Sequence, residues 1–262
     1  MKRGNKLVVT LGGLSLSLFA ITANASFISF SEDFNAPTTG ISYVGNATQP
    51  GPWARLTQNT TGQRGAIWNT TAYSFTSFSV QFDFIIGPSL GQGADGLTFT
   101  VLDAGSHNPN TALGGGGGGL GYLGLGNSFA VELDTWNNGA IDGNNANHVG
   151  VNQNGSINSV ARANLPFALE TSNFNNWLTA NITMDSSGML DVFINGTLYL
   201  SHNLSGFSND AYFGFTSATG AAIDEHYIDN WNMRIEVPEP GTLALFGIGL
   251  AGLGLASRRK KA

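Results

Sequence analysis

Apolar side chains recur at every second position over most of the chain. Between residues 78 and 84, phenylalanine and valine alternate with serine, glutamine and aspartate, and residues 97–101 repeat the pattern with Thr98 and Thr100 between the apolar positions. Successive side chains of a strand point to opposite faces of a sheet, so this period of two predicts strands with one apolar face. We find no segment of useful length with the period of a helix.

Turn signals separate further strands of the same kind. Residues 178–184 and 190–194 alternate on either side of an Asp-Ser-Ser-Gly turn, and Asn195-Gly196, a strong hairpin signal, leads into another strand. Strands with one apolar face need a second sheet to cover it, so residues 26–236 predict an all-β antiparallel sandwich, or jelly roll. In the last strand one face is expected to carry Tyr227, Asp229, Trp231, Met233 and Ile235.

Basic residues are concentrated at the two ends of the chain. The whole sequence has 11 Lys and Arg against 17 Asp and Glu, yet residues 26–237 hold four arginines, no lysine and sixteen carboxylates. A surface this acidic repels phosphate backbones, which argues against nucleic acid as a partner. The chain has no cysteine, which excludes disulfides, thiolate catalysis and cysteine-ligated zinc.

Both ends have the features of export signals. Residues 1–25 combine a basic start, an apolar stretch and the pattern Ala-Asn-Ala before Ser26, which is typical of a secretory signal peptide. Residues 237–262 contain Val-Pro-Glu-Pro, an uncharged apolar run at 241–257 and the cluster Arg-Arg-Lys-Lys. As a helix the run would span ~25 Å, close to the thickness of the bilayer core, and the basic cluster would stay in the cytoplasm.

The order of these C-terminal parts resembles the PEP-CTERM sorting signal of Gram-negative bacteria. The resemblance implies a hydrophobic sorting helix that a membrane protease of the exosortase type recognises and removes. A plain membrane anchor is the alternative that the residues leave open. The chain then divides into a signal peptide at 1–25, a domain at 26–236 and a sorting signal at 237–262. The domain would work outside the cytoplasm, at the cell surface, on the outer membrane or in the extracellular matrix, and would meet the membrane only through its C-terminal segment.

Acidic and polar residues follow one another where a predicted strand ends. Glu132 and Asp134 share a face of that strand, and Asn138, Asp142 and His148 follow. Two neighbouring carboxylates repel each other unless a cation lies between them. Carboxylates with an amide oxygen suit Ca²⁺, and an imidazole suits a transition ion such as Mn²⁺, so the series indicates a paired site. Spacing alone leaves open that the loop binds nothing and that His148 is an ordinary surface histidine.

Four motifs resemble, in the same order, segments of the legume-type (L-type) lectins. The metal segment is Val-Glu-Leu-Asp-Thr-Trp-Asn-Asn at 131–138, followed by Asp142 and His148. The other three are Ala-Asp-Gly-Leu-Thr-Phe at 94–99, Leu-Gly-Tyr-Leu-Gly-Leu at 120–125 and Phe-Gly-Phe-Thr-Ser-Ala-Thr-Gly-Ala at 213–221. The resemblance covers nearly all of the predicted domain and implies a concanavalin-type sandwich.

The resemblance also implies which residues form the sites. A transition ion, Mn²⁺ or another, would be held by Glu132, Asp134, Asp142 and His148, and Ca²⁺ by Asp134, the Trp136 carbonyl, Asn138 and Asp142. The saccharide site would comprise the acceptor Asp95, the backbone N–H of Gly121, a stacking ring at Trp136, the donor Asn138 and the rim residues Ala221 and Ala222. The peptide between Ala94 and Asp95 would be cis. The ions would not touch the sugar but would fix the groups that do.

Six consecutive glycines at 114–119 depart from the family pattern. Such a run predicts a loop far more flexible than the family's. Ordering it would cost on the order of 1 kcal/mol per fixed residue, which would weaken the affinity for saccharide.

We therefore expect an exported, metal-dependent carbohydrate-binding protein whose partners are glycans or exopolysaccharide. No enzyme is expected. Some β-glucanases of this architecture use Glu-x-Asp-x-x-Glu on one strand, and here Asn137 stands at the third position, where an amide cannot supply the proton. A matrix or coat protein whose metal site only stabilises the fold is left open, and so is pairing of two copies as a homodimer.

Overall fold

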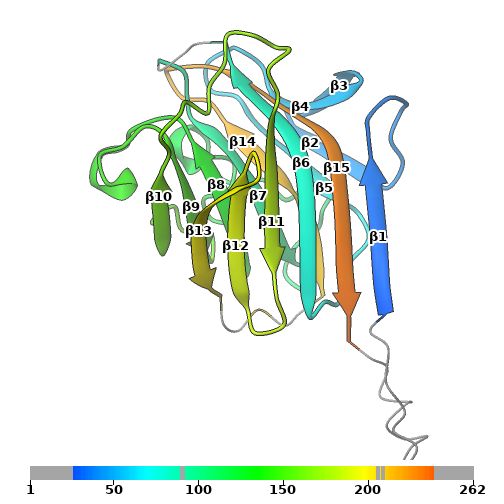
Figure 1. Cartoon of the computed structure of the whole chain (residues 1–262). Coiled ribbons are helices and arrows are strands. Elements are labelled where there is room, and N and C mark those ends of the chain that lie inside the picture. Colours follow the sequence, from blue (N-terminus) through cyan, green and yellow to red (C-terminus); the bar gives the residue numbers. More distant parts are fainter. Residues whose placement is uncertain (1–25, 89–91, 205–206, 208–209, 239–262) are drawn as a thin grey trace, which may run out of the picture.

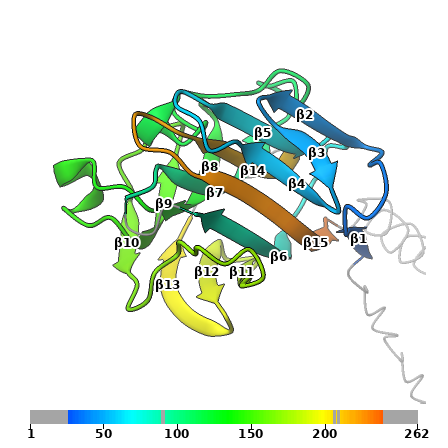
Figure 2. The same ribbon diagram turned by 90° about the horizontal axis from the view of Figure 1, so that it is seen from above.

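The computed structural model describes residues 26–88, 92–204, 207 and 210–238. Over these residues the chain folds into two antiparallel sheets packed face to face (Figures 1 and 2). The predicted signal peptide and the apolar part of the predicted sorting signal lie outside the described residues. Within the described part, no helix is long and apolar enough to cross a bilayer.

The two sheets have eight and seven strands. The eight-stranded sheet has the order β13 (Thr197–Asn203), β12 (Met189–Ile194), β11 (Leu178–Met184), β6 (Ser77–Gly87), β15 (Glu225–Val237), β4 (Trp53–Thr57) and β3 (Thr48–Gly51), with β1 (Ser26–Glu32) also paired to β15. The seven-stranded sheet has the order β10 (Ala161–Asn164), β9 (His148–Gln153), β8 (Ser128–Asp134), β7 (Gly96–Asp103), β14 (Ala211–Ala218), β5 (Arg64–Asn69) and β2 (Ile41–Gly45). The predicted all-β sandwich is confirmed.

Phenylalanine side chains from both sheets meet in the core. The rings of Phe82 on β6 and Phe215 on β14 pack edge to face with centroids 4.6 Å apart, and Phe78 and Phe213 do so at 5.5 Å. On β6 the alternation that the sequence predicted is confirmed, because every second side chain from Phe78 to Ile86 is buried in this core. Burying such a ring contributes ~2 kcal/mol or more to the free energy of unfolding.

The alternation predicted for the last strand is wrong over its first half. The pairing of β15 with β6 shifts register between Asp229 and Asn232, and Asn230 has a φ of 48°. This bulge adds one residue and reverses the alternation on one side of it. Ile228 and Trp231 therefore both point into the core, whereas Asp229 is only half-buried.

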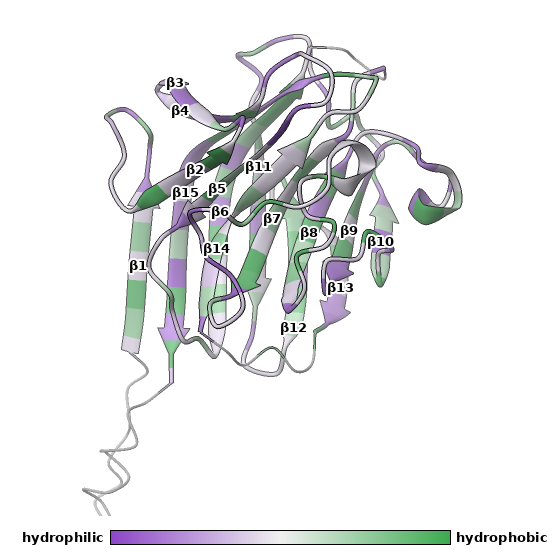
Figure 3. Ribbon diagram, turned by 180° about the vertical axis from the view of Figure 1, so that it is seen from behind, coloured by the Kyte–Doolittle hydropathy of each residue, from purple (hydrophilic) through white to green (hydrophobic). Residues whose placement is uncertain are grey.

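Loops cover the outer face of the seven-stranded sheet, which Figure 3 views from that side. A second apolar cluster forms there from Trp68, Leu102, Tyr122 and Ala130, with Leu125 among its other members. The indole N–H of Trp68 on β5 donates to the Ala112 carbonyl oxygen at 2.9 Å. This hydrogen bond attaches the loop between β7 and β8 to the sheet. As a result all eight residues of β7 are buried.

The two ends of the domain leave it side by side. Ser26 on β1 pairs with Val237 at the end of β15 (Figure 1). β15 begins at Glu225, close in sequence to Ala218, where β14 pairs with Gly96. A strand of this length spans roughly 40 Å. The loops after Asp134 and before Gly96 therefore lie at the end of the sandwich opposite to Ser26 and Val237.

Candidate functional site

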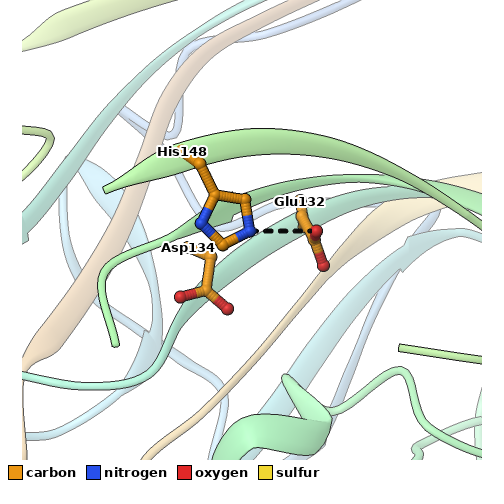
Figure 4. A group of neighbouring side chains, drawn as sticks. All are labelled: Glu132, Asp134 and His148. Atoms are coloured by element: carbon orange, nitrogen blue, oxygen red, sulfur yellow. Dashed lines mark hydrogen bonds and ion pairs between the residues drawn. The ribbon is translucent and has the colours of Figure 1, made fainter. Parts of the chain in front are cut away.

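Three buried side chains with metal-binding atoms meet where β8 ends and β9 begins. Glu132 and Asp134 are on β8, and His148 opens β9 directly opposite Asp134 in the antiparallel register (Figure 4). One ligand atom from each of the three residues lies within 4.8 Å of the other two. Each residue is at most 2% exposed. The fold thus brings three of the predicted metal-binding residues into one cluster shielded from solvent.

The carboxylates of this cluster are held close enough to oppose ionisation. Burial raises the pKa of Asp134 well above its usual value, and the charge of Glu132 raises it further. Asp142, at the end of the 3₁₀ helix η2 (Gly139–Asp142), has a pKa raised by burial, with a smaller contribution in the same direction from Glu132. Repulsion between the carboxylates favours their protonated forms. A divalent cation bound between these oxygens would take the place of the protons and let the carboxylates ionise.

The donor atoms fit a divalent ion. His148 Nε2 lies 3.3 Å from Glu132 Oε1, and its Nδ1 has no hydrogen-bond partner among the described residues. Two carboxylates with an imidazole nitrogen suit a transition ion such as Mn²⁺. The charge of Asp142 also raises the pKa of Asp134, and oxygen ligands of this kind suit Ca²⁺.

Residues that the sequence analysis did not single out hold Glu132 in place. The Asn152 side-chain amide and the Ser159 hydroxyl both donate to its carboxylate. Gly150 lies against the same group, because a β-carbon there would be 2.1 Å from Glu132 Oε1. The one sequence signal was period two on β9, which places Gly150 and Asn152 on the same face as His148.

The loop after β8 directs backbone N–H groups onto the acidic side chains. Trp136 N–H donates to Asp134 Oδ1 at 2.8 Å, and Asn138 N–H donates to Asp142 Oδ2. Trp136 is 38% exposed, and Asn138 is also exposed. Both residues thus lie at the rim of the metal cluster, and the Ca²⁺ ligand set of the sequence analysis stays a prediction.

Asp95 lies next to this cluster, at the start of β7. The peptide between Ala94 and Asp95 is cis, as the resemblance implied. Asp95 is 3% exposed, and its Oδ2 has no hydrogen-bond partner among the described residues. Burial raises the pKa of Asp95 to about 7; a hydrogen bond from the Gly220 backbone acts against this shift, and the charge of Asp142 adds to it. A hydroxyl donor from a ligand would satisfy this buried acceptor.

A network of buried hydroxyl groups supports the segments around Asp95. Thr216 Oγ1 donates to the Leu120 carbonyl oxygen at 2.7 Å and lies 2.8 Å from Thr98 Oγ1. Ser217 Oγ donates to the Gly96 carbonyl oxygen at 2.7 Å. These three hydroxyls fix β7 and β14 to the loop that precedes β8, and sequence reasoning missed them because they contact each other only after the strands pair.

The six glycines, predicted to form a flexible loop, fold here into a compact turn held by backbone hydrogen bonds. Gly114 N–H donates to the Gly121 carbonyl oxygen at 2.6 Å and Gly115 N–H to the Leu123 carbonyl oxygen at 2.9 Å. The turn contains a short 3₁₀ helix, η1 (Gly117–Gly119). A β-carbon at Gly114 would lie 2.5 Å from the Tyr122 backbone, so close packing at this position requires glycine.

The remaining predicted saccharide residues are Gly121, which follows the glycine run, and Ala221 and Ala222. The backbone N–H of Gly121, predicted to face the sugar, donates here to the Gly115 carbonyl oxygen at 2.8 Å. Ala221 is exposed and Ala222 half-buried in the segment between β14 and β15. Both follow Gly220, whose Cα would lie 3.7 Å from a β-carbon at Gly117 of the turn.

Comparison with known families matches two parts of the chain. Residues 29–231 match the legume lectin beta-barrel domain, and residues 236–260 match the PEP-CTERM protein-sorting motif. Among curated proteins, the L-type lectin-domain containing receptor kinase IV.1 of Arabidopsis thaliana is 27% identical over 85% of this chain. The chain spans between 29% and 37% of the length of that kinase and of two similar ones.

Solved lectin structures have the same fold. A lectin from Bauhinia forficata in complex with GalNAc superposes with a TM-score of 0.69 at 23% identity, over 81% of this chain and all of the lectin. The acidic lectin of winged bean in complex with methyl-α-D-galactose superposes with a TM-score of 0.68 at 23% identity, over 82% of this chain and all of that lectin.

Proposed function

Because this chain belongs to the legume (L-type) lectin family, we propose that it is an exported protein that binds neutral saccharides in a metal-dependent way. The observation that carries the proposal is the buried acceptor Asp95, with an oxygen left without a hydrogen-bond partner among the described residues, beside a cluster of metal-binding groups. A sugar hydroxyl would donate to Asp95, and the Asn138 amide and the Trp136 ring would complete the contacts from the rim.

Divalent ions would organise this site. Glu132, Asp134, Asp142 and His148 would hold a transition ion, and Asp134, the Trp136 carbonyl, Asn138 and Asp142 would hold Ca²⁺. When bound, the ions neutralise the carboxylates and keep the loop after β8 in one conformation. No catalytic role is proposed, because Asn137 stands where a second catalytic carboxylate would be needed.

The position of the saccharide site relative to the sorting motif supports binding to a ligand outside the cell. The sorting motif at 236–260 starts where β15 ends, and Asp95 lies at the opposite end of the sandwich. Before an exosortase-type protease removed the motif, the saccharide site would point away from the membrane. Glycans of the cell surface or exopolysaccharide of the surrounding matrix are therefore the proposed ligands.

Galactose-type sugars are the first probes, since two lectins of the same fold were solved with GalNAc and methyl-α-D-galactose. The experiment applies the exported protein, loaded with Ca²⁺ and Mn²⁺, to an array of neutral saccharides that includes galactosides and mannosides. Asp95→Asn keeps the size of the side chain but removes the charged acceptor, so we expect binding to fall at least ~10-fold.

The matched control is Asp103→Asn, a buried aspartate at the far end of β7. This variant should bind like the wild type, and both variants should keep the wild-type melting temperature within a few degrees. If the wild type binds no saccharide on the array, the domain is better described as a matrix protein in which the metal cluster only stabilises the fold.

A further inference from the structure

The glycine strap, defined here as residues 114–119, crosses the proposed saccharide site. A β-carbon at Gly118 would lie 2.6 Å from Asn138 Nδ2. A β-carbon at Gly117 would lie 3.9 Å from Asp95 Oδ2 and 3.7 Å from the Cα of Gly220. The strap therefore lies against Asn138 on one side and beside Asp95 and Gly220 on the other, next to residues proposed to contact the sugar.

The strap also engages the groups that a sugar would contact. Its Gly115 carbonyl accepts the hydrogen bond from the Gly121 N–H, the donor proposed to face the sugar. Asp95 is covered to the point of being 3% exposed, yet the strap supplies no donor to its Oδ2. The buried acceptor is thus shielded but not satisfied, a state that a ligand hydroxyl would relieve.

The strap is bonded at its ends to a neighbouring segment, and its middle makes the local hydrogen bonds of a 3₁₀ turn, from the Gly119 N–H to the Gly116 carbonyl oxygen at 3.0 Å and from the Leu120 N–H to the Gly117 carbonyl oxygen at 2.9 Å. The Gly114 and Gly115 N–H groups bond to the segment 121–123, and Gly119 packs against the Leu123 side chain. A β-carbon at Gly116, by contrast, would meet no atom within 4 Å. With no side chains of its own, the strap has only backbone contacts to lose when its middle moves, and glycine permits the dihedral changes that such a movement needs.

From this geometry we infer that the glycine strap is a displaceable lid over the saccharide site. A sugar enters when residues 115–118 move aside, and the Gly121 N–H then exchanges the Gly115 carbonyl oxygen for an oxygen of the sugar. The inference rests on the proposed function. The apparent affinity is the affinity of the open form reduced by the fraction of molecules that are open.

A reversible cross-link tests the lid directly. A β-carbon at Gly117 would lie 3.7 Å from the Cα of Gly220, and one at Gly220 would lie 3.6 Å from the Cα of Gly117, so the pair Gly117→Cys and Gly220→Cys is close enough for a disulfide. The chain has no other cysteine to interfere. Oxidation should lower binding to GalNAc and methyl-α-D-galactoside, or to any sugar bound on the array, at least ~10-fold, and reduction should restore it.

The two single-cysteine variants are the controls, and their binding should not respond to oxidation. Equal binding by the oxidised and reduced double variant would overturn the lid while leaving the proposed function intact. If neither the reduced double variant nor the wild type binds any saccharide, the proposed function fails, and the lid fails with it.

A second variant should shift the equilibrium between the closed and open forms of the strap toward the open form. Gly117 has a φ of 57°, which an alanine adopts at a cost, so Gly117→Ala should populate the open form and tighten binding roughly fivefold. Gly126→Ala is the matched control, because Gly126 lies outside the strap and a β-carbon there would meet no atom within 4 Å, and its binding should equal that of the wild type. Weaker binding by Gly117→Ala would mean that the strap is part of the binding surface and not a lid.

Discussion

The Thr135 N–H donates a hydrogen bond to the backbone carbonyl oxygen of Asp95, with the two atoms 3.1 Å apart. Thr135 directly follows Asp134 of the metal cluster, and the Asp95 N–H is in turn bonded to the Ala218 carbonyl oxygen at 3.1 Å. The backbone of Asp95, the proposed sugar acceptor, is therefore hydrogen-bonded to the first residue after β8, where the metal-binding loop begins. This hydrogen bond, together with the pairing of Gly96 with Asp134, links Asp95 to the start of that loop.

Removal of divalent ions should weaken saccharide binding without altering any group that contacts the sugar. Without ions, repulsion among Glu132, Asp134 and Asp142 favours protonation and movement of the loop that positions Asp95. We expect EDTA followed by dialysis to lower binding at least ~10-fold, and Ca²⁺ with Mn²⁺ to restore it. Isothermal titration calorimetry measures the affinity, using a sugar that the protein has been found to bind on the array. Unchanged affinity after complete metal removal would contradict the link between the two sites.

The metal content itself should depend on Asp134. Asp134→Asn removes one charge from the cluster, and we expect it to retain less than about a tenth of the wild-type transition ion after dialysis, since charged oxygen ligands dominate binding of such ions. Inductively coupled plasma mass spectrometry gives the stoichiometry. Asp191→Asn, at a half-buried position of β12 in the other sheet, is the control and should retain the wild-type content.

Gly150 should tolerate no side chain. A methyl group there would lie 2.1 Å from Glu132 Oε1 and 2.7 Å from Ser159 Oγ. Gly150→Ala must displace one of these groups, and we expect a loss of about 1–3 kcal/mol in the free energy of unfolding, measured by urea denaturation. Gly126→Ala is the comparison, because a β-carbon at Gly126 would meet nothing within 4 Å, and it should be close to neutral.

His226 should make the fold sensitive to acid. Complete burial lowers the pKa of His226 to about 3, and its Nδ1 lies 2.6 Å from Thr57 Oγ1. In the unfolded chain the pKa is ~6.5, so between these values only the unfolded state binds the proton. Stability should therefore fall as the pH is lowered below about 6.5, by up to ~1.4 kcal/mol per pH unit from this residue.

The measurement is the free energy of unfolding of the wild type and His226→Asn at several values of pH from 7.5 to 4.5, with metal-free protein throughout. Each protein is referred to its own stability at pH 7.5, so that a general packing loss in the variant cancels. The variant should lose less stability on acidification than the wild type. Parallel curves would show that His226 titrates normally in the folded protein.

The amino-acid sequence by itself determined the class of fold and predicted a set of site residues, of which the structure brings Glu132, Asp134 and His148 into one cluster. Alternation on β6 identified its inward face, and Asn195-Gly196 marked a hairpin whose two residues have φ values of 49° and 77°. These features are local, because a strand's period and a turn's dihedral angles depend on neighbouring residues. Period two on β8 likewise placed Glu132 and Asp134 on one face, whereas spacing alone left the role of His148 open and the family's motif was needed to assign it to the site.

Only the tertiary structure decided how these parts meet. The bulge at Asn230 follows from pairing with β6, and the roles of Gly150, Asn152 and Ser159 follow from the position of the Glu132 carboxylate between them. The glycine run at 114–119 predicted flexibility from its composition. It is instead ordered by backbone hydrogen bonds and lies against Asn138 and Gly220, residues distant in sequence. Such contacts depend on which segments the packing of two sheets brings together, and no local pattern encodes that.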